Sequence, residues 1–524
     1  MSVDVRRIPG NKRLASDYVF AFGGLAPFFS GDPAERSAWT TAIARTQAHP
    51  RRSSELAAVI RAQQQRRGAT GATVVNGAKL ADPSTVAIVT GQQAGLFGGP
   101  LYTILKALTA IKLAEQITRE HGVTAVPVFW IESEDHDWDE VRSCTVLDAE
   151  MAPRTVALPS RTGDPIPVAA VPVDEQIHSV LVELEQVLPP TEFRDTLLSD
   201  VRAAYAPGVG MADAFGRLLE RVLGARGLVV YDASDPAAKP LVGDLFAREL
   251  STPGETAKLA AAAGADLAAR GYHAQVQTSD VTGVALFRLD GARRPIHQPA
   301  ELVREAAERP AGFSPGVLLR PLVQDTVLPT VCYVAGPNEL AYLGQLRGVY
   351  ERFGVPMPIM YSRASATILD AAAMRFVAKY DVPFEALAPQ DDSALNELLR
   401  TQIPPEVDDA LVAVGRALEE RMSRVVATVP ALDPTLEAAA KNTLSRMQHD
   451  LANLHGKTIQ AAKRRNETLR RQFQRTRALA FPHGHPQERT IAFIWFLNQY
   501  GEAFVERLWQ ELPLEMGTHW VVTI

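Results

Sequence analysis

A short strand that leads into a glycine-rich turn constrains the fold of this chain more than any other feature. Residues 85–90, TVAIVT, are small or β-branched and uncharged, which is typical of a strand buried on both faces of a parallel sheet. The turn at 91–100 follows, and residues 101–117 then place their apolar side chains at helical spacing. A second strand is predicted at 126–132, VPVFWIE. Because crossovers of this kind are right-handed, the two strands are expected to be parallel neighbours.

The same alternation continues along the chain and predicts the fold class. Strands that alternate with helices indicate an α/β protein with a Rossmann-like core, built on a doubly wound parallel sheet. Two stretches interrupt the alternation, the proline-rich and polar segment 150–212 and the alanine-rich segment 251–275, and both are interpreted as insertions. Further strands are predicted at 228–234, 284–289, 330–336 and 357–362, and further helices at 215–227 and 339–354.

The two ends of the chain differ from this core. An N-terminal helical segment, 1–75, is expected to pack on the core through the apolar stretch 16–29, SDYVFAFGGLAPFF. The core is assigned to 76–390, a helical arm to 391–480 and a short C-terminal unit, closing with strand-like WVVTI, to 481–524. A heptad-like alternation in the arm predicts a short coiled coil and a homodimer formed through it. Its members are Leu444, Met447, Leu451, Leu454, Thr458 and Ala461.

Composition excludes several classes of protein. The net charge of −6 argues against binding of nucleic acid by bulk electrostatic attraction. Two cysteines, Cys144 and Cys332, are too few for a disulfide scaffold or a cysteine-rich zinc site, which indicates a reducing compartment. The first residues lack the apolar segment of a signal peptide, and no apolar run approaches the ~20 residues that span a membrane. We therefore expect a cytoplasmic protein that binds neither nucleic acid nor membranes.

Glycines in the turn at 91–100 would let a ligand approach the end of the first strand. Gly91, Gly95, Gly98 and Gly99 permit tight turns and close backbone contact, and the start of the following helix favours an anion. The spacing matches neither the dinucleotide-binding nor the phosphate-loop pattern. A ligand site and a plain packing turn therefore fit the sequence equally well. A ligand site here also includes Gln92, Gln93, Pro100 and Tyr102.

Six acids and one histidine crowd residues 132–140, directly after the second strand. One interpretation is a site for an amine or a ribose, in which His136 acts as acid or base beside Asp135 and Asp137. Trp130 and Glu134 then belong to the substrate site. A second interpretation is a carboxylate site for a hard metal ion, and a third is a helix N-terminus whose acids complement the dipole. The first is preferred, and no metal is predicted.

A third group of candidate residues surrounds the strand at 330–336. Arg320 either clamps a carboxylate or phosphate with two hydrogen bonds or forms a structural ion pair with Asp325. Asn338 is a plausible N-cap for the following helix. The substrate site is expected to include Arg320, Gly336, Asn338, Glu339 and Tyr342.

The basic stretch 457–477 is interpreted first as a solvated helix face. The alternative is a second nucleotide or anion site that combines Arg465 with Gln487, Arg489, Asn498 and Tyr500. Of the two cysteines, Cys332 lies in an apolar strand and is expected in the core, whereas Cys144 follows the acidic run with no base partner nearby in the sequence.

Several long motifs, in this order, resemble the cysteine-adding enzyme family of bacillithiol biosynthesis. The resemblance extends over nearly the whole chain and includes the N-terminal SDYVFAF. It is carried by TGQQAGLFGGPLYTILKALTAIKLA at 90–114, PVFWIESEDHDWDEV at 127–141, SPGVLLRPLVQDTVLPTVCYVAGPNELAYLGQL at 314–346 and FPHGHPQERTIAFIWFLNQYG at 481–501.

The resemblance implies a fold and a reaction. It implies a Rossmann-like core related to nucleotidyl transferases, two connecting-peptide insertions and a coiled coil used for dimerisation. It also implies a ligase that joins cysteine through an amide to the amine of glucosaminyl-malate, with ATP or another nucleotide as the activating cosubstrate. The turn that carries paired histidines in class I aminoacyl-tRNA synthetases has no histidine here. Alternatives are another small-molecule amide ligase, a nucleotidyl transferase, or a non-catalytic dimeric scaffold that binds nucleotide.

Overall fold

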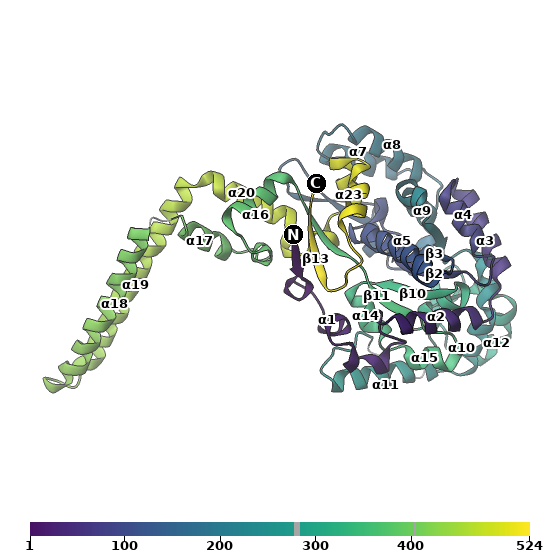
Figure 1. The fold of residues 1–524 in the computed structure, drawn as a ribbon, viewed down its shortest axis with the longest axis horizontal. Helices are drawn as coiled ribbons and strands as arrows, with labels where there is room; N and C mark the ends of the chain where they lie inside the picture. The colour runs from purple at the N-terminus through teal and green to yellow at the C-terminus, as the bar shows by residue number, and fades with distance from the viewer. Residues whose placement is uncertain (277–282, 403–404) are drawn as a thin grey trace. The chain divides into compact units, whose positions relative to one another are not determined.

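The computed structural model describes residues 1–276, 283–402 and 405–524 (Figure 1). The chain divides into two compact units. The first comprises Met1–Ile368, His485–Val522 and Ile524, and the second comprises Leu369–Gly484 and Thr523. The second unit thus begins ahead of residue 391, where the sequence-based division starts the helical arm. Among the described residues, none of the helices has both the length and the apolar composition that a membrane span requires.

A five-stranded parallel sheet forms the centre of the first unit. Its order is β11-β10-β2-β3-β6, and all four neighbouring pairs are parallel. The first of these strands along the chain therefore lies in the middle, and the winding reverses between β2 and β10. This is the arrangement of a doubly wound Rossmann-like fold. The strands are β2 (Val86–Gln93), β3 (Ala125–Glu132), β6 (Val229–Asp232), β10 (Thr330–Ala335) and β11 (Ile359–Ser362).

Helices cover both faces of this sheet, as the uncharged strands require. Val86 and Ile88 pack in one apolar cluster with helices α2 (Arg36–Ala48) and α5 (Tyr102–His121). The alternate residues, Ala87 and Val89, face a second cluster that includes α1 (Arg13–Phe20) and α3 (Ser53–Arg67). The segment 16–29 docks there as predicted, with Tyr18, Leu25, Phe28 and Phe29 buried.

Two insertions separate the core strands. Between β3 and β6 lie the hairpin β4 (Ser143–Leu147) and β5 (Pro153–Ala157) and helices that include α7 (Ile177–Val187), α8 (Arg194–Ala204) and α9 (Met211–Leu223). Between β6 and β10 lie α10 (Gly243–Ser251), α11 (Glu255–Ala269), α12 (Pro299–Glu308), α13 (Arg320–Val327) and a small sheet. The small sheet has the order β8-β7-β9, with β7 at Leu286–Leu289, β8 at Arg293–Pro295 and β9 at Phe313–Pro315.

Two elements differ from their predictions. The strand expected at 284–289 exists as β7, but it lies outside the parallel sheet because it pairs antiparallel with its close sequence neighbour β8, which needs only a short turn. The helix expected at 339–354 is two helices, α14 (Pro337–Leu343) and α15 (Arg347–Phe353). The break contains Gln345, whose buried amide donates to the carbonyl of Ala260 at 3.3 Å and accepts from Val276 at 2.9 Å.

The C-terminal residues return to the first unit. Strand β13 (Thr518–Thr523) pairs antiparallel with β1 (Ser2–Asp4), in a sheet of order β1-β13-β12. This joins the two ends of the chain, and β12 (Ser365–Leu369) forms the other edge. The N-terminal strand was not predicted, because three residues are too few to show an alternating pattern.

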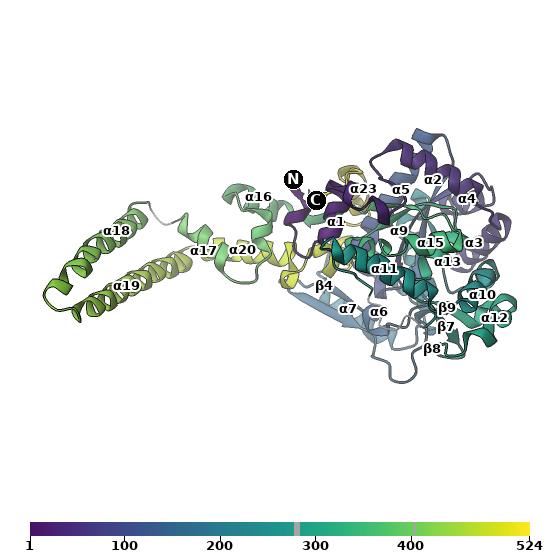
Figure 2. The ribbon, with the colours of Figure 1, turned by 90° about the horizontal axis from the view of Figure 1, so that it is seen from below.

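Helices α18 (Pro405–Thr428) and α19 (Leu436–Arg465) form an antiparallel hairpin in the second unit (Figure 2). His455 of α19 lies 3.1 Å from Asp408 of α18. In the predicted heptad, Leu444 and Leu451 are half-buried, whereas Met447 and Leu454 remain 43% and 52% exposed. The coiled coil therefore forms within one chain and leaves an apolar row available to a partner. The homodimer remains a prediction.

Candidate functional site

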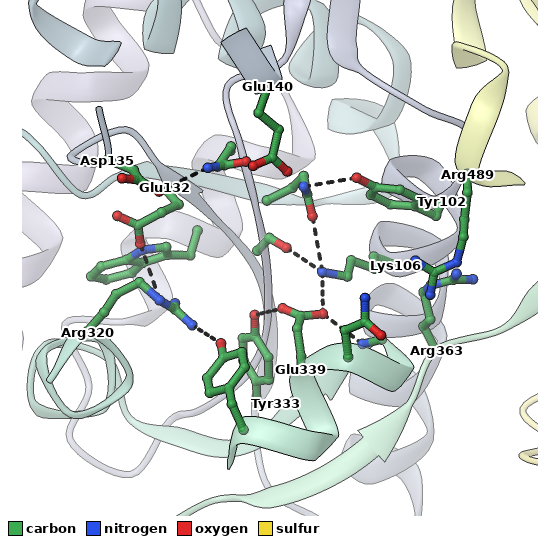
Figure 3. Close-up of a pocket in the computed structure, with 17 residues that line it drawn as sticks. Tyr102, Lys106, Glu132, Asp135, Glu140, Arg320, Tyr333, Glu339, Arg363 and Arg489 are labelled. Carbon is green, nitrogen blue, oxygen red and sulfur yellow. Dashed lines mark hydrogen bonds and ion pairs between the residues drawn. The ribbon is translucent and has the colours of Figure 1, made fainter. Parts of the chain in front are cut away.

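A polar cavity of about 380 Å³ opens at the carboxyl ends of β2, β3 and β10, where the winding of the sheet reverses (Figure 3). Ligands of open α/β sheets bind at this position. All of its lining belongs to the first unit. The lining residues are Gly91, Gln92, Gln93, Tyr102, Lys106, Trp130, Glu132, Asp135, Glu140, Arg320, Tyr333, Gly336, Asn338, Glu339, Tyr342, Arg363 and Arg489.

A buried lysine, Lys106, holds one side of this cavity in place through hydrogen bonds. Lys106 reaches from α5 to the end of β2, where its Nζ donates to the carbonyl of Gly91 at 2.8 Å and to Gln92 Oε1 at 3.3 Å. Gly91 has no room for a side chain, because a Cβ there would lie 2.8 Å from the carbonyl oxygen of Trp130 on the neighbouring strand. The lysine thus ties α5 to the strand end that carries Gln92 and Gln93.

Glu339 completes this arrangement from the start of α14. Its Oε2 lies 2.5 Å from Lys106 Nζ and accepts from the backbone N–H of Gly336 at 2.7 Å, while its Oε1 accepts from the Tyr333 hydroxyl at 2.7 Å. Burial alone would raise the pKa of Glu339, but Lys106 and these hydrogen bonds hold it below its usual value. Lys106 and Glu339 therefore form a compensated pair that positions backbone and side chains around the cavity.

Carboxylates gather at the end of β3 (Figure 3). Glu132 accepts from the Trp130 indole N–H at 3.1 Å and lies 3.5 Å from Arg320, whose guanidinium also donates to the Tyr342 hydroxyl at 2.5 Å. Burial raises the pKa of Glu132 to about 7, despite Arg320. Asp135 accepts from Gln93 Nε2 at 3.0 Å. Burial also raises the pKa of the third lining acid, Glu140.

Two arginines lie at the other end of the cavity. Arg363 donates two hydrogen bonds to Glu488, at 2.6 and 3.1 Å, and both side chains are buried. In the described part of the chain, Arg489 has no carboxylate within ion-pair distance. Burial and the neighbouring Arg363 lower its pKa. A half-buried guanidinium without an ion-pair partner favours an anion, so this wall is suited to a carboxylate or a phosphate.

A second cavity of about 270 Å³ adjoins the first. The two share Gln92, Gln93, Tyr102, Glu140 and Arg489. The remaining lining comes from the glycine-rich turn, the β4 region and the segment after Arg489, and consists of Gly95, Gly99, Pro100, Val141, Ser143, Cys144, Thr145, Thr490 and Ala492. The N-terminus of α5 therefore lies beside Arg489, which places two sources of positive potential at one point.

Most of the candidate residues on the glycine turn and around 320–342 meet in these two cavities. Gly98 is the exception. It is buried at a φ of 88°, and a Cβ there would lie 2.1 Å from the ring of Phe493. Its lack of a side chain therefore makes room for the Phe493 ring, and Gly98 lines neither cavity. The alternative ion pair between Arg320 and Asp325 does not form: Arg320 pairs with Glu132, and Asp325 accepts from the Tyr350 hydroxyl.

The side chains of the acidic run 132–140 have different surroundings and different roles. His136 is 45% exposed, does not line either cavity, and lies 3.0 Å from Arg293. Asp137 caps α6 (Trp138–Val141), and Glu134 is buried in an ion pair with Lys239. Because these side chains diverge, the run does not assemble a metal site; nor do the described residues elsewhere bring together three or more His, Cys, Asp or Glu side chains for one.

The residues predicted to form a second anion site do not come together either. Arg489 belongs to the main cavity, whereas Gln487 is buried and bonds to the backbone of Ile368. Asn498 is buried and donates to the carbonyl of Pro189 at 3.1 Å, and Tyr500 is half-buried at the end of α22 (Phe493–Tyr500). The side chain of Arg465 lies outside the described residues.

The two thiols are both buried. Cys332 lies in the core of β10, as expected, and Cys144 lines the second cavity. Burial raises the pKa of both thiols, which disfavours the nucleophilic thiolate.

Sequence reasoning missed three residues that line the main cavity: Lys106, Tyr333 and Arg363. Glu132 and Glu140 were singled out only as members of the acidic run and were given no role of their own. A signal existed for Lys106, which is a single charge on the buried side of the helix predicted at 101–117. A different signal existed for Glu132 and Arg363, because each lies at or just after the carboxyl end of a predicted strand, where ligands bind. Tyr333 gave no signal, because an aromatic residue within a buried strand is ordinarily core.

Comparisons with known proteins agree with this architecture. A family model described as "Bacillithiol biosynthesis BshC, N-terminal Rossmann-like domain" matches residues 1–364, and its "C-terminal coiled-coil domain" counterpart matches residues 366–524. Relatives named "Putative cysteine ligase BshC" include proteins of Salinibacter ruber (34% identical, over 97% of this chain and 95% of the relative) and Koribacter versatilis (30%, over 97% and 96%). Another, from Symbiobacterium thermophilum, is 34% identical over 86% of each chain. This chain therefore belongs to the BshC family of bacillithiol biosynthesis.

Proposed function

We propose that this protein is a ligase that joins the carboxyl group of cysteine to the amine of glucosaminyl-malate through an amide bond. The observation that carries the proposal is the polarity of the main cavity. Carboxylates lie at the end of β3, and Arg489, which has no ion-pair partner among the described residues, lies at the opposite end. An acceptor with an amine at one end and a malate group at the other has matching charges.

Each wall has a defined task in this proposal. Asp135 and Glu132 receive the amine, and Arg489 pairs with a malate carboxylate. Gln92, Gln93 and Tyr102 lie between the two walls and offer amide and hydroxyl groups to the sugar. The buried Trp130 fixes the orientation of Glu132 through its indole N–H.

Joining a carboxylate to an amine also requires an activating cosubstrate. ATP, when bound, supplies that activation to the carboxylate of cysteine. The second cavity fits an anionic cosubstrate, because it joins the N-terminus of α5 to Arg489, and Gly95, Gly99 and Tyr102 would hold it. The second cavity shares five lining residues with the main cavity, so a cosubstrate bound there would lie next to the acceptor.

The test is direct. Purified protein is mixed with cysteine, glucosaminyl-malate and ATP, and mass spectrometry follows the thiol product together with AMP and ADP. We expect the thiol product, and none when cysteine is replaced by serine or ATP is omitted. Nucleotide binding without any product contradicts the proposal in favour of a non-catalytic scaffold. Product formed only with a different amine would reassign the protein to another amide ligase.

A further inference from the structure

The two carboxylate oxygens of Glu132 have different surroundings. Oε2 accepts from the Trp130 indole N–H at 3.1 Å and lies 3.5 Å from Arg320 Nε. Among the described residues, Oε1 has no hydrogen-bond partner. The side chain is 16% exposed, and it lines the cavity. One oxygen is thus held in place while the other remains free to accept a proton from a ligand.

The other two acids of this wall are less suited to that task. In Asp135, Oδ1 accepts from the backbone N–H of His136 at 2.8 Å and Oδ2 accepts from Gln93 at 3.0 Å, so both oxygens are already engaged. Glu140 lies further along the chain on α6, where its residue is exposed and its carboxylate accepts a hydrogen bond from Gln93. Of the three, only Glu132 combines a fixed position, a free oxygen and a buried environment.

We propose that Glu132 is the general base that takes the proton from the acceptor amine during amide formation, an inference that rests on the proposed function. The acceptor reacts as its free base. As its nitrogen forms the new C–N bond, the bond between the carbonyl carbon and its leaving group breaks, and the leaving group departs with the electron pair. The proton that nitrogen loses moves to Glu132 Oε1 and then to water.

The environment of Glu132 matches this role. Burial raises its pKa to about 7, and a base with a pKa near the working pH is the most effective. The charged groups that face it are Arg320 from α13 and Arg293 from β8, which favour ionisation, and Glu134 and Asp135 from its own segment, which oppose it. The Tyr342 hydroxyl on α14 binds the same arginine. The ionised form therefore dominates above about pH 7.

The decisive variant is Glu132→Gln, which keeps the shape and removes the base. We expect its turnover to fall by roughly 10²–10⁴-fold, the usual loss when a general base is removed. Calorimetry should show that the variant still binds the acceptor. The wild-type rate should decline below about pH 7, and this acid limb should be absent from the variant. Glu132→Asp retains a carboxylate and should retain the limb at a lower rate, and it serves as the test if the glutamine variant does not fold.

Glu249→Gln is the matched control. Glu249 is also a buried glutamate with a raised pKa, caused first by burial, but it bonds to Thr256 and Ala285 outside both cavities. Its variant should keep the wild-type rate and acid limb. A wild-type protein that makes no product would contradict the proposed function itself. If the wild type makes product and Glu132→Gln keeps both rate and pH profile, only the role of Glu132 is overturned.

Discussion

Replacing Glu488 with glutamine should test whether the C-terminal segment supports the cavity. Glu488 is buried beside Arg363, and their side chains are 5% and 3% exposed. Its oxygens accept two hydrogen bonds from Arg363 and one, at 2.9 Å, from the backbone N–H of Ala366. Burial alone would raise the pKa of Glu488, but Arg363 and these bonds lower it from 4.5 to about 2.

The lowered pKa of Glu488 sets the expected loss of stability in the Glu488→Gln variant. A pKa unit corresponds to about 1.4 kcal/mol, so the ionised Glu488 contributes on the order of 3 kcal/mol to stability at neutral pH. Breaking a buried ion pair ordinarily costs about 3–5 kcal/mol, which agrees. Because the pKa is lower in the folded state, this stabilisation is fully present above pH 4.5 and is lost as the pH falls towards 2.

Equilibrium urea unfolding, followed by near-ultraviolet circular dichroism, measures the change. Glu488→Gln should lower the free energy of unfolding by about 3 kcal/mol at pH 7, and the difference from wild type should shrink below pH 4.5. The control is Glu506→Gln, which breaks an exposed pair with Arg226 and should cost at most about 1 kcal/mol. Equal stability of Glu488→Gln and wild type at pH 7 would refute the reasoning. Ligase activity should also decline, since Arg363 lines the cavity.

Four further predictions follow from the geometry. Gly98→Ala should destabilise the protein by about 2–4 kcal/mol, from its positive φ and the clash with Phe493, and adding Phe493→Leu should restore part of this in thermal unfolding; no loss would contradict the packing role. Arg489→Met should raise the KM for the acceptor roughly 10–100-fold in steady-state assays, through loss of a charged hydrogen bond, and an unchanged KM would move the carboxylate elsewhere. His136→Ala should turn over close to wild type because His136 lies outside both cavities, whereas the sequence motif alone predicts a loss. Light scattering at micromolar concentration should show a homodimer that Leu454→Asp weakens, and a wild-type monomer would exclude the dimer.

The sequence determined the elements whose patterns are local. The strand at 85–90, the helix at 101–117 and the strand at 126–132 could be located because burial on both faces, helical spacing and a glycine turn each leave a mark within a few residues. Their order along the chain then fixed a parallel sheet with its ligand edge at the strand ends. For the same reason Gly91 and Asp135 were singled out before their neighbours in space were known.

Tertiary structure alone decided what each of these residues faces. Gly91 and Gly98 both lie in the glycine-rich turn after the first predicted strand. Gly98 nevertheless makes room for Phe493, which is distant in sequence, whereas Gly91 lines the main cavity. Glu132 and Glu134 are two residues apart, but the first faces the cavity while the second is buried against Lys239. A motif shows which charged groups are present, but the partner of a buried charge determines whether that charge is stable and which way it points. Here the partners, Lys239 for Glu134 and Arg320 for Glu132, come from segments a hundred or more residues away.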